Sequence, residues 1–144
     1  MSDLAKIREL TETLGIRDEK LIDKGRVLEF LMENLLAGYW DWEIETGKEV
    51  LSDTWKGMFG YKPDELEDRV ESWIKLIYPE DLVVAVKNYE KHVETKGKFP
   101  YDQEVRYYHK DGSTVHVRCF GKVYEWDGDK PKRMVGLHTF IKKI

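Results

Sequence analysis

The side chains with the widest chemical range in this chain are one cysteine and four histidines, Cys119, His92, His109, His116 and His138. A single cysteine cannot form an internal disulfide, and the sequence offers no cysteine pair to bind a metal ion. No nucleophile elbow, phosphate-binding loop, dinucleotide fingerprint or HExxH motif occurs. The sequence therefore predicts a protein that is not an enzyme and holds no metal.

The histidines differ in where the surrounding pattern places them. His109 and His116 fall at a predicted hairpin end and at an outward strand position, which favours surface roles. His92 lies at the border of the apolar face of a long predicted helix, within reach of the interior. His138 lies in the last predicted strand, which is apolar on both faces.

Four of the five tryptophans, Trp40, Trp42, Trp55 and Trp73, are candidates for the wall of a ligand cavity. Aromatic residues at strand and helix spacing can line a ligand cavity, or they can close the core by packing on one another. Both interpretations stay open on the sequence alone.

Charge and hydropathy exclude several classes of partner. With 24 basic and 28 acidic residues among 144, the net charge is -4, so no nucleic-acid partner is expected. No apolar run approaches the roughly 20 residues that span a bilayer, and the N-terminus MSDLAKIREL is charged where a secretory signal is hydrophobic. We expect a soluble, cytoplasmic protein with no membrane contact.

Alternation of period two predicts five strands. Residues 39–44 and 49–51 form the first pair, and three more strands cover 102–109, 113–124 and 132–141, with turns at KDGS and DGDKP. Val105, Tyr107, Val115, Val117 and Cys119 should share one face, and Glu104, Arg106, Thr114, His116 and Arg118 the other. The outer face also carries Tyr39, Tyr108 and Phe120, so we expect something to cover it.

Short helices separate the two groups of strands. Ser52 is placed to cap a first helix, and Gly60 suits its left-handed exit. Pro63 and Pro79 each begin a helix, and the longest runs from about Pro79 to Thr95 with Leu82, Val86, Tyr89 and Val93 on its apolar face. The order predicts an α+β fold: a five-stranded antiparallel sheet with short helices on one face.

Residues 1–36 form a helical leader before a domain at 37–144. The leader carries a strict seven-residue repeat at Ile7, Leu14, Leu21, Leu28 and Leu35. This repeat fits the seam of a coiled-coil homodimer, and it equally fits an amphipathic helix packed on its own domain.

In order and spacing, the segments GYWDWEIETG, MFGY, YPED, EVRYYHKDGS and RMVGLHTFI resemble the PAS sensor domain with its PAC extension. The resemblance implies a sensory or dimerising module that acts on an effector such as a histidine kinase or cyclase, in the same or a separate chain. The chain departs from the family pattern at Phe140 and Lys142, where relatives commonly read HTDIT. The link to an effector is therefore left open.

The resemblance also raises cofactors, of which none is strongly implied. Some PAS relatives bind haem through a histidine like His92, and flavin-binding relatives place a polar side chain where His138 stands. The light-driven cysteine adduct of a PAS subclass needs a helical cysteine, whereas Cys119 is predicted in mid-strand.

We expect any ligand pocket to lie between the sheet and the short helices. The candidate wall residues are Trp42, Phe59, Trp73, Ile77, Tyr89, His92, Tyr107, Val117 and His138. The function predicted first is a sensor that binds a small ligand or partner and dimerises; the alternative is a ligand-free interaction scaffold.

Overall fold

The computed structural model describes residues 24–144 of the chain. The chain divides into two compact units, residues 1–34 and 35–144. Helix α2 (Lys24–Leu35) begins the described part, so the repeat positions Ile7, Leu14 and Leu21 lie outside the described residues. Along residues 24–144, no helix has both the length and the apolar character required to cross a membrane.

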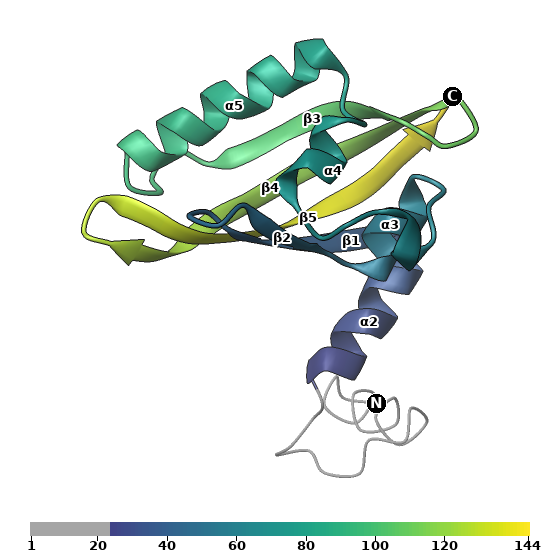
Figure 1. The fold of residues 1–144 in the computed structure, drawn as a ribbon, viewed down its shortest axis with the longest axis horizontal. Helices are drawn as coiled ribbons and strands as arrows, with labels where there is room; N and C mark the ends of the chain where they lie inside the picture. Colours follow the sequence, from purple (N-terminus) through teal and green to yellow (C-terminus); the bar gives the residue numbers. More distant parts are fainter. Residues whose placement is uncertain (1–23) are drawn as a thin grey trace, which may run out of the picture. The chain divides into compact units, whose positions relative to one another are not determined.

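The second unit is built on a five-stranded antiparallel sheet, as the sequence predicted (Figure 1). Its strands are β1 (Ala37–Glu43), β2 (Lys48–Leu51), β3 (Tyr101–Tyr108), β4 (Thr114–Asp127) and β5 (Lys130–Lys143), in the order β2-β1-β5-β4-β3. The first strand in sequence therefore pairs with the last, with Trp40 opposite Gly136. This pairing sets the centre of the sheet.

The β4–β5 hairpin is longer than the alternation indicated. Each strand has 14 residues, and Pro131 lies within β5, opposite Trp126, instead of in the turn. The register shifts on either side of Glu125, and a strand irregularity tolerates the missing N–H of proline. Strict alternation of side chains is lost at such shifts, which explains why the two strands were predicted too short.

The helices between β2 and β3 are α3 (Asp53–Met58), a 3-10 turn (Pro63–Glu65), α4 (Val70–Ile74) and α5 (Pro79–Glu94). Ser52 caps α3 by accepting a hydrogen bond from the backbone N–H of Trp55. Gly60 has φ +88°, a left-handed conformation that glycine adopts without a Cβ penalty. Both local expectations are confirmed.

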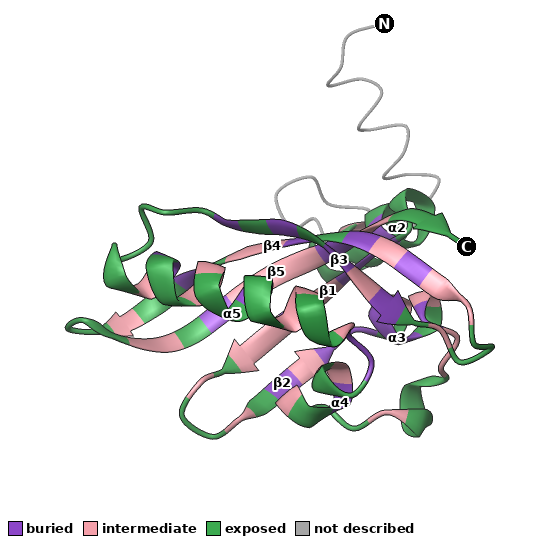
Figure 2. Ribbon diagram, turned by 90° about the horizontal axis from the view of Figure 1, so that it is seen from above, coloured by how far each residue is buried: buried purple, intermediate pink, exposed green. Residues whose placement is uncertain are grey.

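The face of the sheet toward these helices holds the core (Figure 2). Val105, Tyr107, Val115, Val117 and Cys119 are all buried, as period-two alternation predicted. On the opposite face Tyr108 is exposed, and Phe120, Val135 and Leu137 are half-buried. The outer face therefore presents apolar side chains between charged ones.

Helix α5 buries most of the predicted stripe. Leu82, Tyr89 and Val93 are half-buried, but Val86 is 43% exposed, and the most buried residues of the helix are Ala85 and His92. The first turn of the helix is anchored on the sheet, because the Asp81 carboxylate accepts hydrogen bonds from the backbone N–H and the guanidinium of Arg106 in β3. Apolar spacing alone could not reveal that anchor.

The Trp40 side chain packs against two glycines at the centre of the sheet. Gly121 of β4 and Gly136 of β5 are directly opposite one another, and a Cβ atom at either would collide with the Trp40 indole. A Cβ at Gly136 would also meet the backbone oxygen of Phe120. The indole ring therefore occupies the space that two side chains would otherwise fill.

This packing predicts that Gly136→Ala destabilises the domain by roughly 1–3 kcal/mol, because the added methyl overfills a closed contact. Gly57→Ala is the control, since a Cβ there meets nothing within 4 Å and alanine suits a helix. Urea unfolding of both variants measures the difference. A Gly136→Ala protein as stable as Gly57→Ala would show that the space beside Trp40 is not closed to a methyl group.

Candidate functional site

A cavity of about 290 Å³ lies between the helix-covered face of the sheet and helices α4 and α5. Ile74 of α4 and Val86 of α5 belong to its wall and are exposed, so the cavity opens to solvent between these two helices. Its wall is mostly apolar and aromatic. Small-molecule sites typically begin near about 300 Å³, so this one suits a small ligand.

The structure brings five of the predicted candidates together in this wall and leaves four outside it. Those in the wall are Trp42, Trp73, Tyr89, Tyr107 and His138, and those outside are Phe59, Ile77, His92 and Val117. Phe59 is fully buried with its ring 4.6 Å from those of Trp55 and Tyr107. Ile77 and Val117 are buried in the same core cluster. These three side chains pack in the core beside the residues of the cavity wall.

His92, a predicted pocket candidate, lies outside the cavity wall and links two backbone groups by hydrogen bonds. Its side chain is 1% exposed, with Nδ1 2.7 Å from the carbonyl oxygen of Phe99 and Nε2 accepting a hydrogen bond from the Val123 N–H at 3.1 Å. Nδ1 must therefore carry the proton. The acceptor nitrogen is already used, so His92 has no free lone pair for a haem iron.

His138 lies in the wall with half of its hydrogen-bonding capacity used. Its Nε2 is 2.9 Å from the hydroxyl of Tyr107, while its Nδ1 is buried and has no hydrogen-bond partner among residues 24–144. Burial lowers the pKa of His138 to about 3, so the ring is neutral at physiological pH. It can offer one further polar atom at the cavity.

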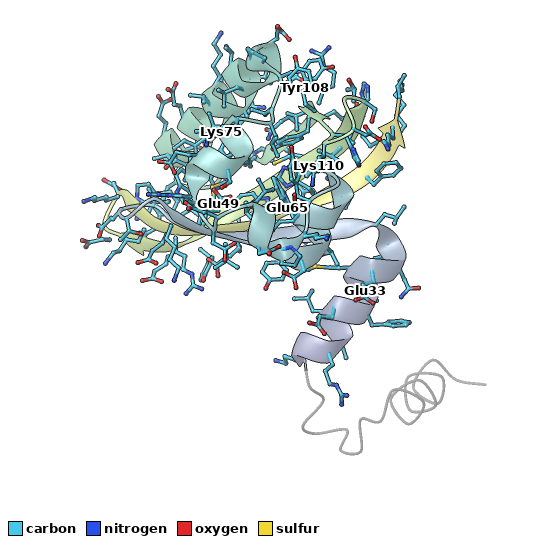
Figure 3. All side chains as sticks on the ribbon, turned by 45° about the vertical axis from the view of Figure 1, so that its right-hand side comes forward. Glu33, Glu49, Glu65, Lys75, Tyr108 and Lys110 are labelled. Atoms are coloured by element: carbon cyan, nitrogen blue, oxygen red, sulfur yellow. The ribbon has the colours of Figure 1, made fainter. Side chains whose placement is uncertain are left out.

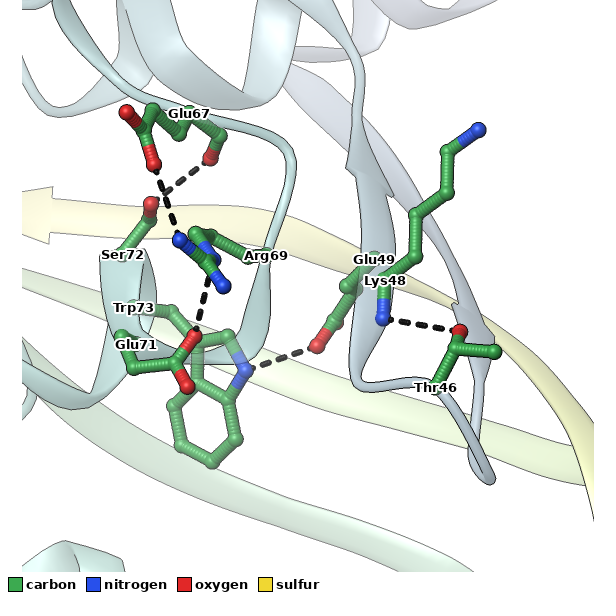
Figure 4. Close-up of polar contacts among 8 residues, drawn as sticks. All are labelled: Thr46, Lys48, Glu49, Glu67, Arg69, Glu71, Ser72 and Trp73. Atoms are coloured by element: carbon green, nitrogen blue, oxygen red, sulfur yellow. Dashed lines mark hydrogen bonds and ion pairs between the residues drawn. The ribbon is translucent and has the colours of Figure 1, made fainter.

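Glu49 is a charged wall residue that was absent from the predicted candidates. The Glu49 side chain, labelled in Figure 3, is 5% exposed, and the indole N–H of Trp73 donates a hydrogen bond to its Oε1 at 2.8 Å (Figure 4). Figure 4 shows Lys48 pointing to the other side of β2. Alternation already placed Glu49 on the face of Leu51, which is 2% exposed, and this was the available signal.

Burial raises the pKa of Glu49 to about 7, with the nearby Asp41 carboxylate adding to the rise and the Trp73 hydrogen bond opposing it. Such a carboxyl is half-charged near neutral pH. Perturbed carboxyls of this kind in a cleft are typical of functional sites.

Three indole N–H groups add to the polar capacity near the cavity. The Nε1 atoms of Trp40, Trp42 and Trp55 are buried, and none has a hydrogen-bond partner within the described part of the chain. An indole N–H only donates, so it pairs with an acceptor oxygen or nitrogen. The wall therefore combines donors, one carboxyl and one free imidazole nitrogen.

The site shows little chemistry beyond binding. Cys119 lines the cavity from β4, and burial raises the pKa of its thiol to about 12, which keeps it protonated and unreactive. Across residues 24–144 no three His, Cys, Asp or Glu side chains are grouped to hold a metal ion. The strand position of Cys119, the occupied ring of His92 and the small cavity do not fit a flavin adduct or a haem.

The raised pKa predicts that Glu49→Gln stabilises the protein at alkaline pH. The folded carboxyl binds its proton more tightly than the unfolded one, so wild-type stability falls as pH rises from about 4.5 to about 7. Glutamine keeps the acceptor for Trp73 and has no proton to lose. We expect a gain of roughly 2–3 kcal/mol at pH 8 that vanishes near pH 4.

Denaturant unfolding at both pH values measures this gain. Glu104→Gln, at an exposed β3 position, is the control and should show no such pH-dependent change. Equal stability of Glu49→Gln and wild type at pH 8 would show that the Glu49 carboxyl is not desolvated.

Comparison with known proteins places this geometry in a family. No curated protein matches the chain. A sensory box histidine kinase/response regulator from Burkholderia thailandensis E264 is 28% identical, with a TM-score of 0.67 over 79% of this chain and 83% of that one.

Two further solved structures share the fold. The N-terminal domain of a diguanylate cyclase with PAS/PAC sensor from Marinobacter aquaeolei is 21% identical, with a TM-score of 0.60 over 72% of this chain and 94% of that one. The PAS domain of a protein from Colwellia psychrerythraea is 15% identical, with a TM-score of 0.58 over 80% of this chain and 97% of that one. The sequence profile of the PAS fold matches residues 48–138, which is more than half of the chain. The chain belongs to the PAS fold family.

Proposed function

We propose that this PAS domain is a non-catalytic cytoplasmic sensor whose signal is a small molecule bound in the cavity of Glu49 and His138. The observation that supports it best is the pair of buried polar side chains, each 5% exposed, in an otherwise apolar wall. Burying such groups costs stability unless a partner satisfies them. The Nδ1 of His138 has no hydrogen-bond partner among residues 24–144, and a ligand with complementary polar atoms would supply one.

A ligand acts on a sensor only by binding one conformation more tightly than another. The cavity wall includes residues of β1, β2, α4, α5 and the three long strands, so occupancy would bias how these elements pack together. Helix α2 and an effector would respond to that bias. Since two of the similar structures come from a histidine kinase and a diguanylate cyclase, an effector of either kind, in the same or a separate chain, fits this role.

A ligand-free interaction scaffold is the second candidate. It is favoured by the aromatic packing around the cavity, where Trp55, Phe59 and Tyr107 already close much of the interior. A scaffold would leave the remaining space to solvent. The two candidates therefore predict different results for a variant whose cavity is filled: a sensor would lose its bound ligand, and a scaffold would have no ligand to lose.

Filling the cavity with Ala85→Leu should abolish ligand binding. Ala85 is buried in the wall on α5, and a leucine side chain there projects into the remaining volume. Native mass spectrometry of protein purified from cells should detect bound small-molecule mass on wild type and none on Ala85→Leu. Val83→Leu, on the exposed side of α5, is the matched control. Identical apo masses for all three proteins would favour the scaffold.

Dimerisation forms the second half of the proposed function. Leu28, Leu31 and Leu35 of α2 are exposed and fall on one side of the helix, and the outer sheet face presents Tyr108 and Phe120. A homodimer that pairs these apolar surfaces would bury them. Leu28 and Leu35 are also the described members of the seven-residue repeat.

The double substitution Leu28→Glu and Leu35→Glu should convert the dimer to a monomer, because four like charges would then meet in the seam. Light scattering coupled to size-exclusion chromatography measures the mass. Glu33→Gln, on the other side of α2, should leave the dimer intact. A wild-type monomer, or a double variant that stays dimeric, would remove the coiled-coil role of this helix.

A further inference from the structure

The cavity wall combines many aromatic side chains with one carboxyl group. Seven aromatic side chains line it: Trp40, Trp42, Trp55, Trp73, Tyr89, Tyr101 and Tyr107. Glu49 is the one side chain with a full charge available in the described wall, and no Lys or Arg of residues 24–144 lines it. The charge of the site therefore comes from a single carboxylate, and aromatic rings surround it.

Neighbouring rings of the wall pack against one another at an inclination. The ring centroids of Trp40 and Tyr101 are 6.1 Å apart at 82°, and those of Trp42 and Tyr89 are 5.2 Å apart at 49°. A flat polycyclic ligand needs parallel walls, whereas rings inclined to one another surround a compact, rounded group. Aromatic rings attract cations when a positive charge lies within about 6 Å of the ring centre.

Building on the proposed sensor function, we propose that the cavity binds a small alkylated ammonium cation that also carries a hydrogen-bond acceptor, with the Glu49 carboxylate and the aromatic rings around the cationic head. The Trp73 N–H orients Glu49 through the 2.8 Å hydrogen bond. The unpartnered indole N–H groups and the polar edge of His138 provide partners for the acceptor oxygen of the same ligand.

A bound cation would also offset the free energy that it costs to bury the charged Glu49 carboxylate. Glu49 sits where its charged form is disfavoured, and a positive ligand head restores that form by direct attraction. A purely apolar ligand would leave the charged form more costly still. An anionic ligand would be repelled by Glu49.

This account makes the affinity for the cation rise with pH through the pKa of about 7 of Glu49. The charged and titratable groups around Glu49 are Asp41 of β1, Asp68, Arg69 and Glu71 before and in α4, Tyr89 of α5, Tyr101 and Tyr107 of β3, Cys119 of β4 and His138 of β5. Burial keeps Tyr101, Tyr107 and Cys119 protonated by raising each pKa, and keeps His138 neutral by lowering its pKa to about 3. None of those four changes charge between about pH 6 and pH 8.

The test uses choline as the cationic probe and 3,3-dimethyl-1-butanol as its neutral isostere, which has the same shape and the same hydroxyl. Isothermal titration of the full chain should show choline binding at least tenfold more tightly than the isostere at pH 8. The choline affinity should fall severalfold at pH 6 while that of the isostere stays constant.

Two variants identify the groups responsible. Glu49→Gln keeps a neutral hydrogen-bonding side chain and should weaken choline at least tenfold without weakening the isostere. Trp42→Leu keeps an apolar wall and should weaken choline more than the isostere. Near-ultraviolet circular dichroism confirms that both variants are folded.

The outcomes separate this inference from the proposed function. Equal or tighter binding of the isostere, or unchanged choline affinity in Glu49→Gln, overturns the cationic ligand while the sensor cavity stands. Binding of neither probe overturns the cationic ligand as well. The proposed function itself fails only if the native mass spectra also show no bound mass.

Discussion

Helix α5 is hydrogen-bonded to neighbouring residues at its start, middle and end, and the cavity lies between it and the sheet. At its first turn the Asp81 carboxylate accepts the Arg106 backbone N–H at 2.7 Å and two guanidinium N–H groups at 2.9 Å each. In its middle the Asn88 side chain donates to Gln103 of β3 at 3.0 Å. In its last turn His92 is hydrogen-bonded to Phe99 and Val123. Charge-assisted forks of this kind fix orientation as well as distance. Between the anchors the small Ala85 leaves the sheet uncovered, which creates the open volume.

Side-chain alternation predicted the sheet well because one of its faces is buried throughout. Val115, Val117 and Cys119 had to point inward once any of them did, since neighbouring positions alternate strictly. The stripe of α5 was harder. The bulky Val86 was expected inside and is exposed, while the small Ala85 and the polar His92 are buried. Hydropathy records how apolar a residue is, whereas an anchored helix selects which side chains fit.

The candidate site was predictable to the extent that it is aromatic. Trp42, Trp73 and Tyr89, which were chosen by size and spacing, line the cavity. Glu49 was missed because a carboxylate in a short strand usually faces water, and its burial depends on a tryptophan of α4 that lies 24 positions further along the chain. His92 was proposed for the pocket because it lies at the border of the apolar face of α5. Its hydrogen bonds to Phe99 and Val123 could not be foreseen, since they come from a loop and a strand that sequence spacing does not connect to it.

The pairing of the first strand with the last has a consequence for how the protein is made. Trp40 rests on Gly121 and Gly136, and its own strand is joined to β5 along its full length. On a ribosome the N-terminal strand leaves the exit tunnel long before its neighbour is translated. Until the β4–β5 hairpin has been made, β1 can pair only with β2, on its other edge. The edge of β1 that later joins β5 then stays unpaired, and non-local pairing of this kind is slow and exposed to aggregation.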